Sequence, residues 1–307
     1  MELIDRVVEA VCKSTPNPEA RLEAMRLYDA FTKKAPEWGD TKFNTLAVEA
    51  PFFIPLGYKM FAVGVVDRIT SAMFCEWKTH RAPKITKAGV PYKGDSEDDW
   101  LREITGGVQL AVYALAAREG EFLQKSGEKV RYPCDSILVR AALKSKPVGF
   151  WPAKWENGIK KFSDAQLDAT RNALQVRGHQ IRAARISGLV PWGVPGFHCF
   201  AYNRECHMYK DCTQYKYTPL QPKAWHHASD TSPDPGYVVC EQMGWEPQDP
   251  ELVVLSQSAY QTYSLCMERG RVAYGGHVPG ENSLELDTGT AYHAAMATYY
   301  GDHLESK

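Results

Sequence analysis

Three short runs of β-branched and aromatic residues constrain the fold of this 307-residue chain more than any other feature. They occupy residues 44–54, 59–66 and 71–77, and a turn beginning at Pro55 separates the first two. Such runs are typical of β-strands, and connections of only a few residues favour antiparallel neighbours. The sequence therefore predicts an antiparallel meander of three strands.

Helical patterns lie on both sides of this meander. Apolar residues recur at helical spacing through 1–35, where prolines divide the segment in two, and again through 98–118. Residues 133–144 resemble a further strand, and 163–187 are predicted to form a long helix whose second half is basic. Residues 253–307 return to a helical pattern.

Two stretches lack such periodicity. Residues 81–97 are polar and carry Lys, Gly, Asp and Ser, which predicts a mobile loop. Residues 217–252 are rich in Pro, Asp and Ser, which predicts a linker or an extended excursion.

Net charge and hydropathy argue against several classes of protein. The formal net charge of −1 argues against a protein that coats nucleic acid through bulk charge, although a local basic groove is compatible with it. No apolar run approaches the roughly 20 residues that span a bilayer, and the acidic N-terminus does not resemble a signal peptide. We therefore expect a cytoplasmic protein without a membrane partner, whose cysteines are reduced thiols or metal ligands.

Acidic and basic residues mark the ends of the second and third predicted strands. Glu76 and Lys78 share one face of the third strand because side chains alternate, and strand pairing would bring Asp67 near them. Two carboxylates can hold a cation such as Mg²⁺ that activates water, and the ammonium can neutralise charge on a phosphate. Spacing alone favours a salt-bridged surface hairpin, whereas the apolar residues flanking these charges favour a site.

A second polar motif, Gln109-Leu-Ala-Val-Tyr113, follows on the predicted helix 98–118. Positions four residues apart share one face of a helix. The pair is suited to bind a phosphate or to order an active-site residue. The alternative is a core tyrosine beside a solvated glutamine.

Taken in order, these motifs resemble the PD-(D/E)XK nuclease superfamily, in its RecB and exonuclease V-like branch. The resemblance rests on Gly64 with Asp67, Glu76 with Lys78, Gln109 with Tyr113, and the preceding segment Val48-Glu-Ala-Pro-Phe52. It implies an α/β fold, a restriction-endonuclease-like core with a central mixed sheet flanked by helices. It also implies a Mg²⁺- or Mn²⁺-dependent deoxyribonuclease that hydrolyses phosphodiester bonds, as an exonuclease on single-stranded DNA or DNA ends.

The family's remaining element, a helix with Gly-Thr-x-x-His, is found at the far end of this chain as Gly289-Thr-Ala-Tyr-His293. The segment Leu255-Ser-Gln-Ser-Ala-Tyr260 is similar to the family's N-terminal opening. This order implies a circular permutation. Residues 1–216 are then the nuclease core, 217–252 a linker between the former termini, and 253–307 the permuted segment that completes the domain.

In this arrangement the resemblance implies a metal centre assembled from both ends of the chain. His293 supplies nitrogen beside the oxygens of Asp67 and Glu76, and the backbone carbonyl of Trp77 is a further ligand. The alternative for the histidine is an incidental position on an amphipathic surface helix.

Three cysteines, Cys199, Cys206 and Cys212, lie within fourteen residues, which suggests metal binding. The resemblance implies that Cys266 joins them to hold a [4Fe–4S] cluster, although the family's commoner first spacing is C-x2-C rather than C-x6-C. A zinc ion on the same thiolates is the chemical alternative. The other four cysteines are interpreted as buried free thiols: Cys12, Cys75, Cys134 and Cys240.

Basic residues near the long predicted helix are candidates for contact with the DNA backbone. They are Lys160, Lys161, Arg182 and Arg185. A solvated basic helix face explains them equally well.

Three functions remain open from the sequence. The first is the DNA nuclease. The second is a non-cleaving DNA-binding or assembly subunit that retains the nuclease fold. The third is a zinc-binding structural protein unrelated to DNA.

Overall fold

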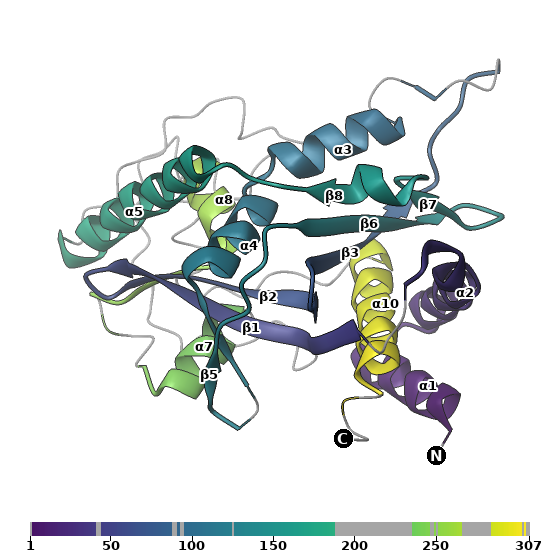
Figure 1. The fold of residues 1–307 in the computed structure, drawn as a ribbon, viewed down its shortest axis with the longest axis horizontal. Helices are drawn as coiled ribbons and strands as arrows, with labels where there is room; N and C mark the ends of the chain where they lie inside the picture. The colour runs from purple at the N-terminus through teal and green to yellow at the C-terminus, as the bar shows by residue number, and fades with distance from the viewer. Residues whose placement is uncertain are drawn as a thin grey trace, which may run out of the picture. The chain divides into compact units, whose positions relative to one another are not determined.

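The computed structural model divides into two compact units, shown in one ribbon in Figure 1. It describes residues 2–40, 44–87, 91–92, 95–124, 126–187, 235–245, 249, 251–265, 284–302 and 304. Unit 1 comprises Met1–Phe52, Val65–Leu167 and Glu281–Lys307, and unit 2 comprises Phe53–Gly64 and Asp168–Gly280.

The described strands form one mixed sheet in the order β5-β4-β1-β2-β3-β6-β7, with β8 paired to β6 and β9 paired to β2. β2 and β3 are antiparallel, as the meander predicts, whereas β3 and β6 are parallel. The strands are β1 (Thr45–Gly57), β2 (Met60–Thr70), β3 (Phe74–Arg81), β4 (Glu121–Leu123), β5 (Lys129–Val130), β6 (Ile137–Lys144), β7 (Gly149–Trp151), β8 (Ile159–Lys160) and β9 (Val253–Leu255).

The helices of unit 1 include two from the N-terminus and one from the C-terminal end of the chain. They are α1 (Leu3–Ser14), α2 (Pro18–Lys34), η1 (Ala35–Trp38), α3 (Glu97–Gly106), α4 (Val108–Glu119), η3 (Trp155–Gly158) and α10 (Leu284–Gly301). The two predicted N-terminal helices are confirmed. Asn17 starts the second one, because its side chain accepts hydrogen bonds from the backbone of Glu19 and Ala20.

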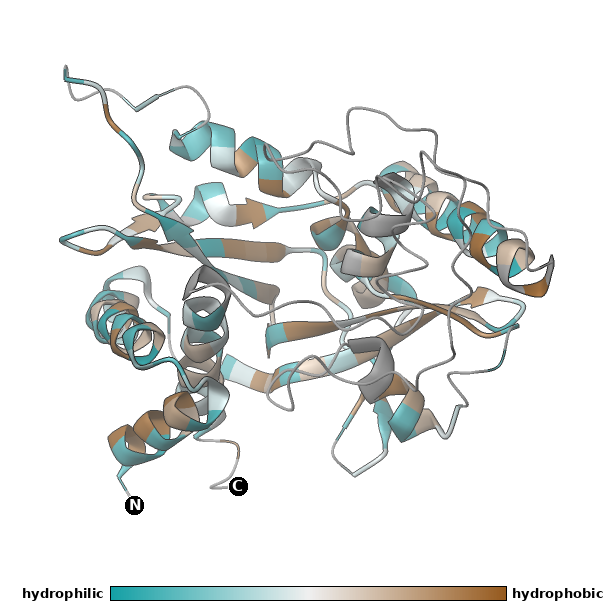
Figure 2. Cartoon of the chain, turned by 180° about the vertical axis from the view of Figure 1, so that it is seen from behind, coloured by the Kyte–Doolittle hydropathy of each residue, from teal (hydrophilic) through white to brown (hydrophobic). Residues whose placement is uncertain are grey.

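α1, α2 and α10 pack together in unit 1 (Figure 1). Their apolar residues form one buried cluster with side chains of β3 and β6. Phe31 of α2 meets Trp77 of β3 edge-to-face at 5.1 Å between ring centroids, and Tyr300 of α10 stacks on the same tryptophan at 5.8 Å. In Figure 2 the two N-terminal helices are hydrophobic on one side and hydrophilic on the other. Burial of this apolar side therefore fixes the three helices against the sheet.

α4 packs against the sheet through a second aromatic cluster. Phe52 of β1 contacts Tyr113 of α4 at 5.8 Å and Phe122 of β4 at 5.6 Å. Phe74 of β3 reaches the same Phe122 at 5.3 Å. Helices thus flank the mixed sheet, and the predicted α/β fold is confirmed.

Unit 2 is built around the turn between β1 and β2. Its helices are α5 (Asp164–Ser187, which begins in unit 1), α7 (Pro235–Met243) and α8 (Gln257–Leu265). α5 is held to the turn through backbone carbonyls, because Gln175 donates to Leu56 and Arg171 donates to Pro55, both at 2.9 Å. Trp245 stacks on Phe61 at 4.0 Å.

The predicted boundaries of the meander were wrong by several residues. β1 continues through Pro55, and the turn lies at Tyr58 and Lys59, which both have positive φ. β2 continues three residues past Asp67, because the buried guanidinium of Arg68 is paired with Asp40 at 2.7 Å instead of entering solvent. Asp67 and Glu76 therefore lie within strands and not at their ends.

Three other predicted segments also differ. The helix expected at 98–118 is two helices, because the backbone is extended at Gly107. Residues 235–243, inside the expected linker, form α7. Residues 253–255 form β9, parallel to β2, before the helices of the C-terminal segment begin. None of the helices in the described ranges is long and apolar enough to cross a membrane.

Candidate metal and catalytic centre

Asp67 occupies the centre of a polar cluster in unit 1. Its side chain is 8% exposed, and its Oδ2 accepts a hydrogen bond from the backbone N–H of Trp77 at 2.6 Å. Its Oδ1 lies 3.4 Å from Nδ1 of His293. One carboxylate thus connects β2, β3 and α10.

Glu76 is the most deeply buried of the predicted acids, at 1% exposure. Its Oε1 accepts a hydrogen bond from Gln109 at 2.6 Å and forms an ion pair with Lys78. The same amide donates to the hydroxyl of Tyr113 at 3.0 Å, and that hydroxyl donates to the carbonyl of Val65 at 2.7 Å. The glutamine–tyrosine motif on α4 therefore orders the buried carboxylate of Glu76, and its tyrosine is also a core residue.

α10 positions His293 through contacts at the far end of the helix. Tyr300 donates to Asp40 at 2.6 Å, and the guanidinium of Arg68 lies 3.7 Å from the centre of the Tyr300 ring. Arg68 also donates to the hydroxyl of Thr45 at 2.9 Å. Since Arg68 directly follows Asp67, this buried network ties the helix that carries His293 to the strand that carries the central acid.

Glu49 belongs to this centre but received no role from the sequence. It lies in β1 with a φ of +46°, a left-handed conformation that non-glycine residues seldom adopt within a strand. Such an outlier costs on the order of 1–3 kcal/mol and is typical of functional sites. The sequence signal was a single acid in the otherwise apolar run of residues 46–54. Its side chain retains solvent-accessible surface even though the charges of Asp67, Glu76 and His293 surround it.

Burial and crowding separate the pKa values of the acids. Loss of hydration in its crowded surroundings, and then the charge of Asp67, raise the pKa of Glu49 to about 8, although the residue keeps an exposed surface. Burial and the charge of Asp67 also raise the pKa of Glu76, although Lys78 opposes them. Burial alone would raise the pKa of Asp67, but His293, Lys78 and the Trp77 N–H together lower it.

For the basic groups, burial lowers the pKa and neighbouring negative charges raise it. Burial would lower the pKa of His293, but the charge and hydrogen bond of Asp67 raise it to about 9. Burial likewise opposes the charged form of Lys78, and the negative charge of Glu76 more than compensates, so its pKa is raised. Without a metal, His293 is therefore the counter-ion of Asp67 near neutral pH.

The residues present fit a divalent cation. Glu49, Asp67 and His293 each offer one ligand atom, and these atoms lie within 4.8 Å of one another. Oε2 of Glu76 is buried and has no hydrogen-bond partner among the described residues. An unpaired buried carboxylate oxygen is unfavourable, and a cation would satisfy it. Carboxylates with one imidazole are a donor set that divalent cations accept in proteins.

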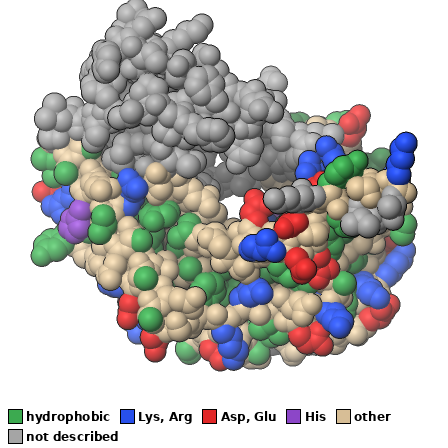
Figure 3. Space-filling model, turned by 90° about the horizontal axis from the view of Figure 1, so that it is seen from above, with side chains coloured by type: hydrophobic (Ala, Val, Ile, Leu, Met, Phe, Trp, Pro, Cys, Tyr) green, Lys and Arg blue, Asp and Glu red, His purple; other side chains and the backbone are tan. Residues whose placement is uncertain are grey.

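The residues predicted to contact the DNA backbone are not part of this polar cluster. Lys161 is paired with Asp135 at 2.5 Å, and Lys160 next to it is on β8. In unit 2, Arg182 donates to the carbonyl of Tyr58 at 3.0 Å, and the side chain of Arg185 lies outside the described part of the chain. Figure 3 shows acidic and basic side chains interspersed on one face, without one broad basic surface among its described residues.

The cysteines separate into two groups. Cys12, Cys75, Cys134 and Cys240 form no disulfide among the described residues; Cys75 and Cys240 are buried as predicted, whereas Cys12 is exposed and Cys134 is half-buried. The four cysteines predicted to hold a cluster all lie outside the described residues, so the structure gives no account of them. They are Cys199, Cys206, Cys212 and Cys266.

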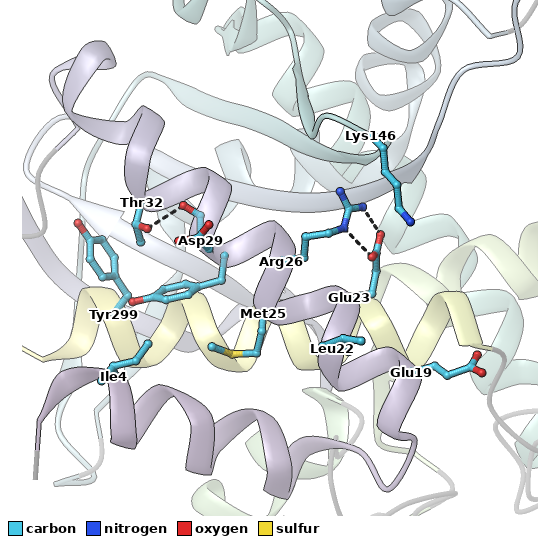
Figure 4. A pocket seen from close by; sticks show the side chains of 11 residues that line it. Ile4, Glu19, Leu22, Glu23, Met25, Arg26, Asp29, Thr32, Lys146 and Tyr299 are labelled. Atoms are coloured by element: carbon cyan, nitrogen blue, oxygen red, sulfur yellow. Dashed lines mark hydrogen bonds and ion pairs between the residues drawn. The ribbon is translucent and has the colours of Figure 1, made fainter.

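A groove of about 850 Å³ lies away from this centre. It is lined by α1, α2, the turn after β6 and the last part of α10, with Leu22, Met25 and Tyr299 among its apolar walls (Figure 4). Arg26 and Glu23 pair at its edge at 2.8 Å. None of the residues of the metal and catalytic centre lines it, so we do not assign the groove to the reaction.

A mixed α/β core with buried acids, a lysine and a histidine at one centre defines a nuclease-type protein. In agreement, the family model of the PD-(D/E)XK nuclease superfamily matches residues 1–194, well over half of the chain. The chain therefore belongs to the PD-(D/E)XK nuclease superfamily, whose members are generally metal-dependent nucleases. The matched range includes Glu49, Asp67, Glu76 and Lys78, whereas His293 lies beyond it. No curated protein and no solved structure matches the chain.

Proposed function

We propose that this protein is a Mg²⁺- or Mn²⁺-dependent deoxyribonuclease that hydrolyses phosphodiester bonds. The observation that carries the proposal is the convergence of Glu49, Asp67 and His293 around one position, near a buried Glu76 whose Oε2 has no partner in the part of the chain that the structure describes. Such an arrangement is unfavourable without a cation, because three carboxylates crowd one another. A divalent cation bound there supplies an activated water and polarises the phosphate.

The chain's own residues have distinct roles in this proposal. Lys78 keeps 30% of its side chain exposed beside Glu76, so in this proposal its ammonium neutralises charge that develops on the phosphate. Gln109 holds the Glu76 carboxylate in place, and Tyr113 holds the glutamine. The N–H of Trp77 fixes the orientation of Asp67.

We propose an exonuclease on single-stranded DNA or DNA ends as the particular activity. The support is the resemblance to the RecB and exonuclease V-like branch, carried by the ordered motifs from Gly64 to Tyr113. A local rather than a global basic surface agrees with the net charge of −1.

We also propose that the chain is circularly permuted, with 253–307 as the family's usual opening. The support is the motif Gly289-Thr-Ala-Tyr-His293 and the packing of α10 against α1 and α2. Through this packing, a histidine near the end of the sequence lies beside Asp67.

Cleavage of end-labelled single- and double-stranded DNA tests the proposed function. We expect degradation of linear DNA in Mg²⁺ or Mn²⁺, no degradation after the metal is removed with EDTA, and recovery when the metal is restored. A ladder that shortens from one end indicates an exonuclease. Purified protein that binds DNA but leaves every substrate intact in both metals would instead be a non-cleaving subunit.

The proposed [4Fe–4S] cluster has its own test. Protein purified without oxygen is expected to be brown and to contain iron and sulfide, because four thiolates suit such a cluster. Cys206→Ser and Cys266→Ser should each lose iron, while Cys12→Ser, at an exposed free thiol, should keep it. Zinc without iron or sulfide would replace the cluster with a structural zinc site.

A further inference from the structure

The segment between β3 and α3 is an irregular arm whose two sides meet at one isolated β-bridge. Ile85 bridges Pro91, and the N–H of Tyr92 donates to the carbonyl of Lys84 at 3.0 Å. Figure 1 shows the chain leaving the end of β3 in this segment and returning to the start of α3. We call residues 81–87, 91–92 and 95 the β3–α3 arm. The sequence predicts a mobile loop here; the described residues do form a loop, and one isolated bridge joins its two sides.

Buried contacts fix the base of the arm. Arg81 donates to Asp95 at 2.5 Å, and that aspartate is only 4% exposed. The N–H of Asp95 also donates to the carbonyl of Tyr92 at 2.9 Å. These contacts hold the base of the arm in one position next to the end of β3.

The outer part of the arm exposes large apolar and aromatic side chains together with lysines. Ile85 is 60% exposed and Tyr92 is 55% exposed. Lys84 and Lys87 are also exposed, and residues 82–92 contain no acid. Aromatic and apolar surface beside exposed lysines is complementary to nucleic acid, in which phosphates alternate with the flat faces of bases.

The arm is a direct continuation of the strand that carries the catalytic lysine. Glu76, Lys78 and His80 share one face of β3, because side chains alternate along a strand. At roughly 3.3 Å per residue, Lys84 lies within about 20 Å of Lys78 along the chain. If one phosphate of a DNA strand is bound at Lys78, the strand therefore comes within reach of the arm several nucleotides away.

We propose that the β3–α3 arm binds the single-stranded part of the DNA substrate next to the scissile phosphate. Lys84 and Lys87 contact phosphates, and Tyr92 stacks on a base. This inference rests on the proposed nuclease function and adds a surface that selects unpaired strands, since bases in a duplex do not expose their faces.

The test compares variants of the full chain in binding a fluorescent single-stranded oligonucleotide, with Ca²⁺ in place of Mg²⁺. Lys84→Ala combined with Lys87→Ala is expected to reduce the slope of log affinity against log salt by about 1.4, at about 0.7 per lost phosphate contact. The matched control, Lys33→Ala with Lys146→Ala, removes two exposed lysines elsewhere in unit 1 and should keep the slope.

The tyrosine is tested separately. Tyr92→Ala should weaken binding about 5- to 100-fold, and Tyr92→Phe should stay close to wild type, because stacking needs the ring but not the hydroxyl. In cleavage assays with Mg²⁺ the arm variants should raise KM and leave kcat nearly unchanged. Melting temperatures equal to that of wild type would show that each variant is folded.

The outcomes distinguish the arm from the nuclease. If wild type cleaves DNA and the lysine variant keeps its salt slope and KM, the arm does not contact the substrate. If Tyr92→Ala equals Tyr92→Phe, the stacking contact is wrong. If wild type neither binds nor cleaves DNA, the nuclease function itself fails.

Discussion

Asp67→Asn is expected to reduce DNA cleavage by at least about 1,000-fold while the protein remains folded. The amide can still accept the hydrogen bond that the Trp77 N–H donates at 2.6 Å, so β2 and β3 keep their register. It loses the negative charge that a cation and His293 both require. A thousandfold loss corresponds to about 4 kcal/mol of transition-state stabilisation. The rate is measured on a 5′-labelled strand at saturating metal.

Lys78→Met should have a comparable effect for a different reason. Methionine keeps much of the volume of the side chain but removes the cation next to Glu76, which then favours its protonated form because it is buried. The change thereby removes the charge proposed to act on the phosphate and neutralises the buried carboxylate beside the proposed metal position. We expect a decrease in rate on the order of 100- to 1,000-fold.

A surface ion pair on α2 supplies matched controls. Asp29 and Lys33 are 2.6 Å apart and mostly exposed, so Asp29→Asn and Lys33→Met make the same chemical changes away from the centre. Each control should cleave DNA at the wild-type rate. Asp67→Asn and Lys78→Met variants that match their controls would exclude this centre from catalysis.

Metal affinity is expected to rise steeply with pH between 6 and 8. In the metal-free protein the pKa of His293 is raised to about 9 and that of Glu49 to about 8, so His293 is protonated across this range and Glu49 loses its proton only toward its upper end. A cation must displace these protons, since only the neutral imidazole and the ionised carboxylate are ligands. Raising the pH removes the competing protons, so the affinity increases with pH and levels off above about 9.

The size of this effect follows from the number of protons released. One proton gives a tenfold gain in affinity per pH unit, and two give up to a hundredfold. An ordinary histidine, with a pKa near 6.5, would give an almost flat profile above pH 7. Titration calorimetry with Mn²⁺ in two buffers of different ionisation enthalpy counts the protons directly.

Glu49→Gln tests which group supplies the protons. It removes one titrating ligand, so the pH profile should become shallower by about one proton while binding persists more weakly. Asp29→Asn should leave the profile unchanged. A Mn²⁺ affinity that is constant from pH 6 to 8, with no proton release, would contradict metal binding by His293 and Glu49.

Most strands and helices in the first half of the chain could be predicted from the sequence, because alternation and periodicity depend only on residues close together in the chain. Alternation and periodicity predicted the N-terminal helices, the meander and the long α5. The boundaries were less accurate where a distant partner decides them. β2 runs past Asp67 because Asp40 and Thr45 receive the guanidinium of Arg68, a contact that no local pattern encodes.

The sequence by itself determined that Asp67, Glu76 and Lys78 lie on neighbouring strands, followed by Gln109 and Tyr113 four residues apart on a helix. Only the tertiary structure decided that Glu49 faces the same centre, because its left-handed backbone breaks the alternation by which strand faces are read. Only the packing of α10 decided that His293 meets Asp67. Contacts between residues so distant in the chain depend on the buried surfaces of whole helices and not on any spacing within the sequence.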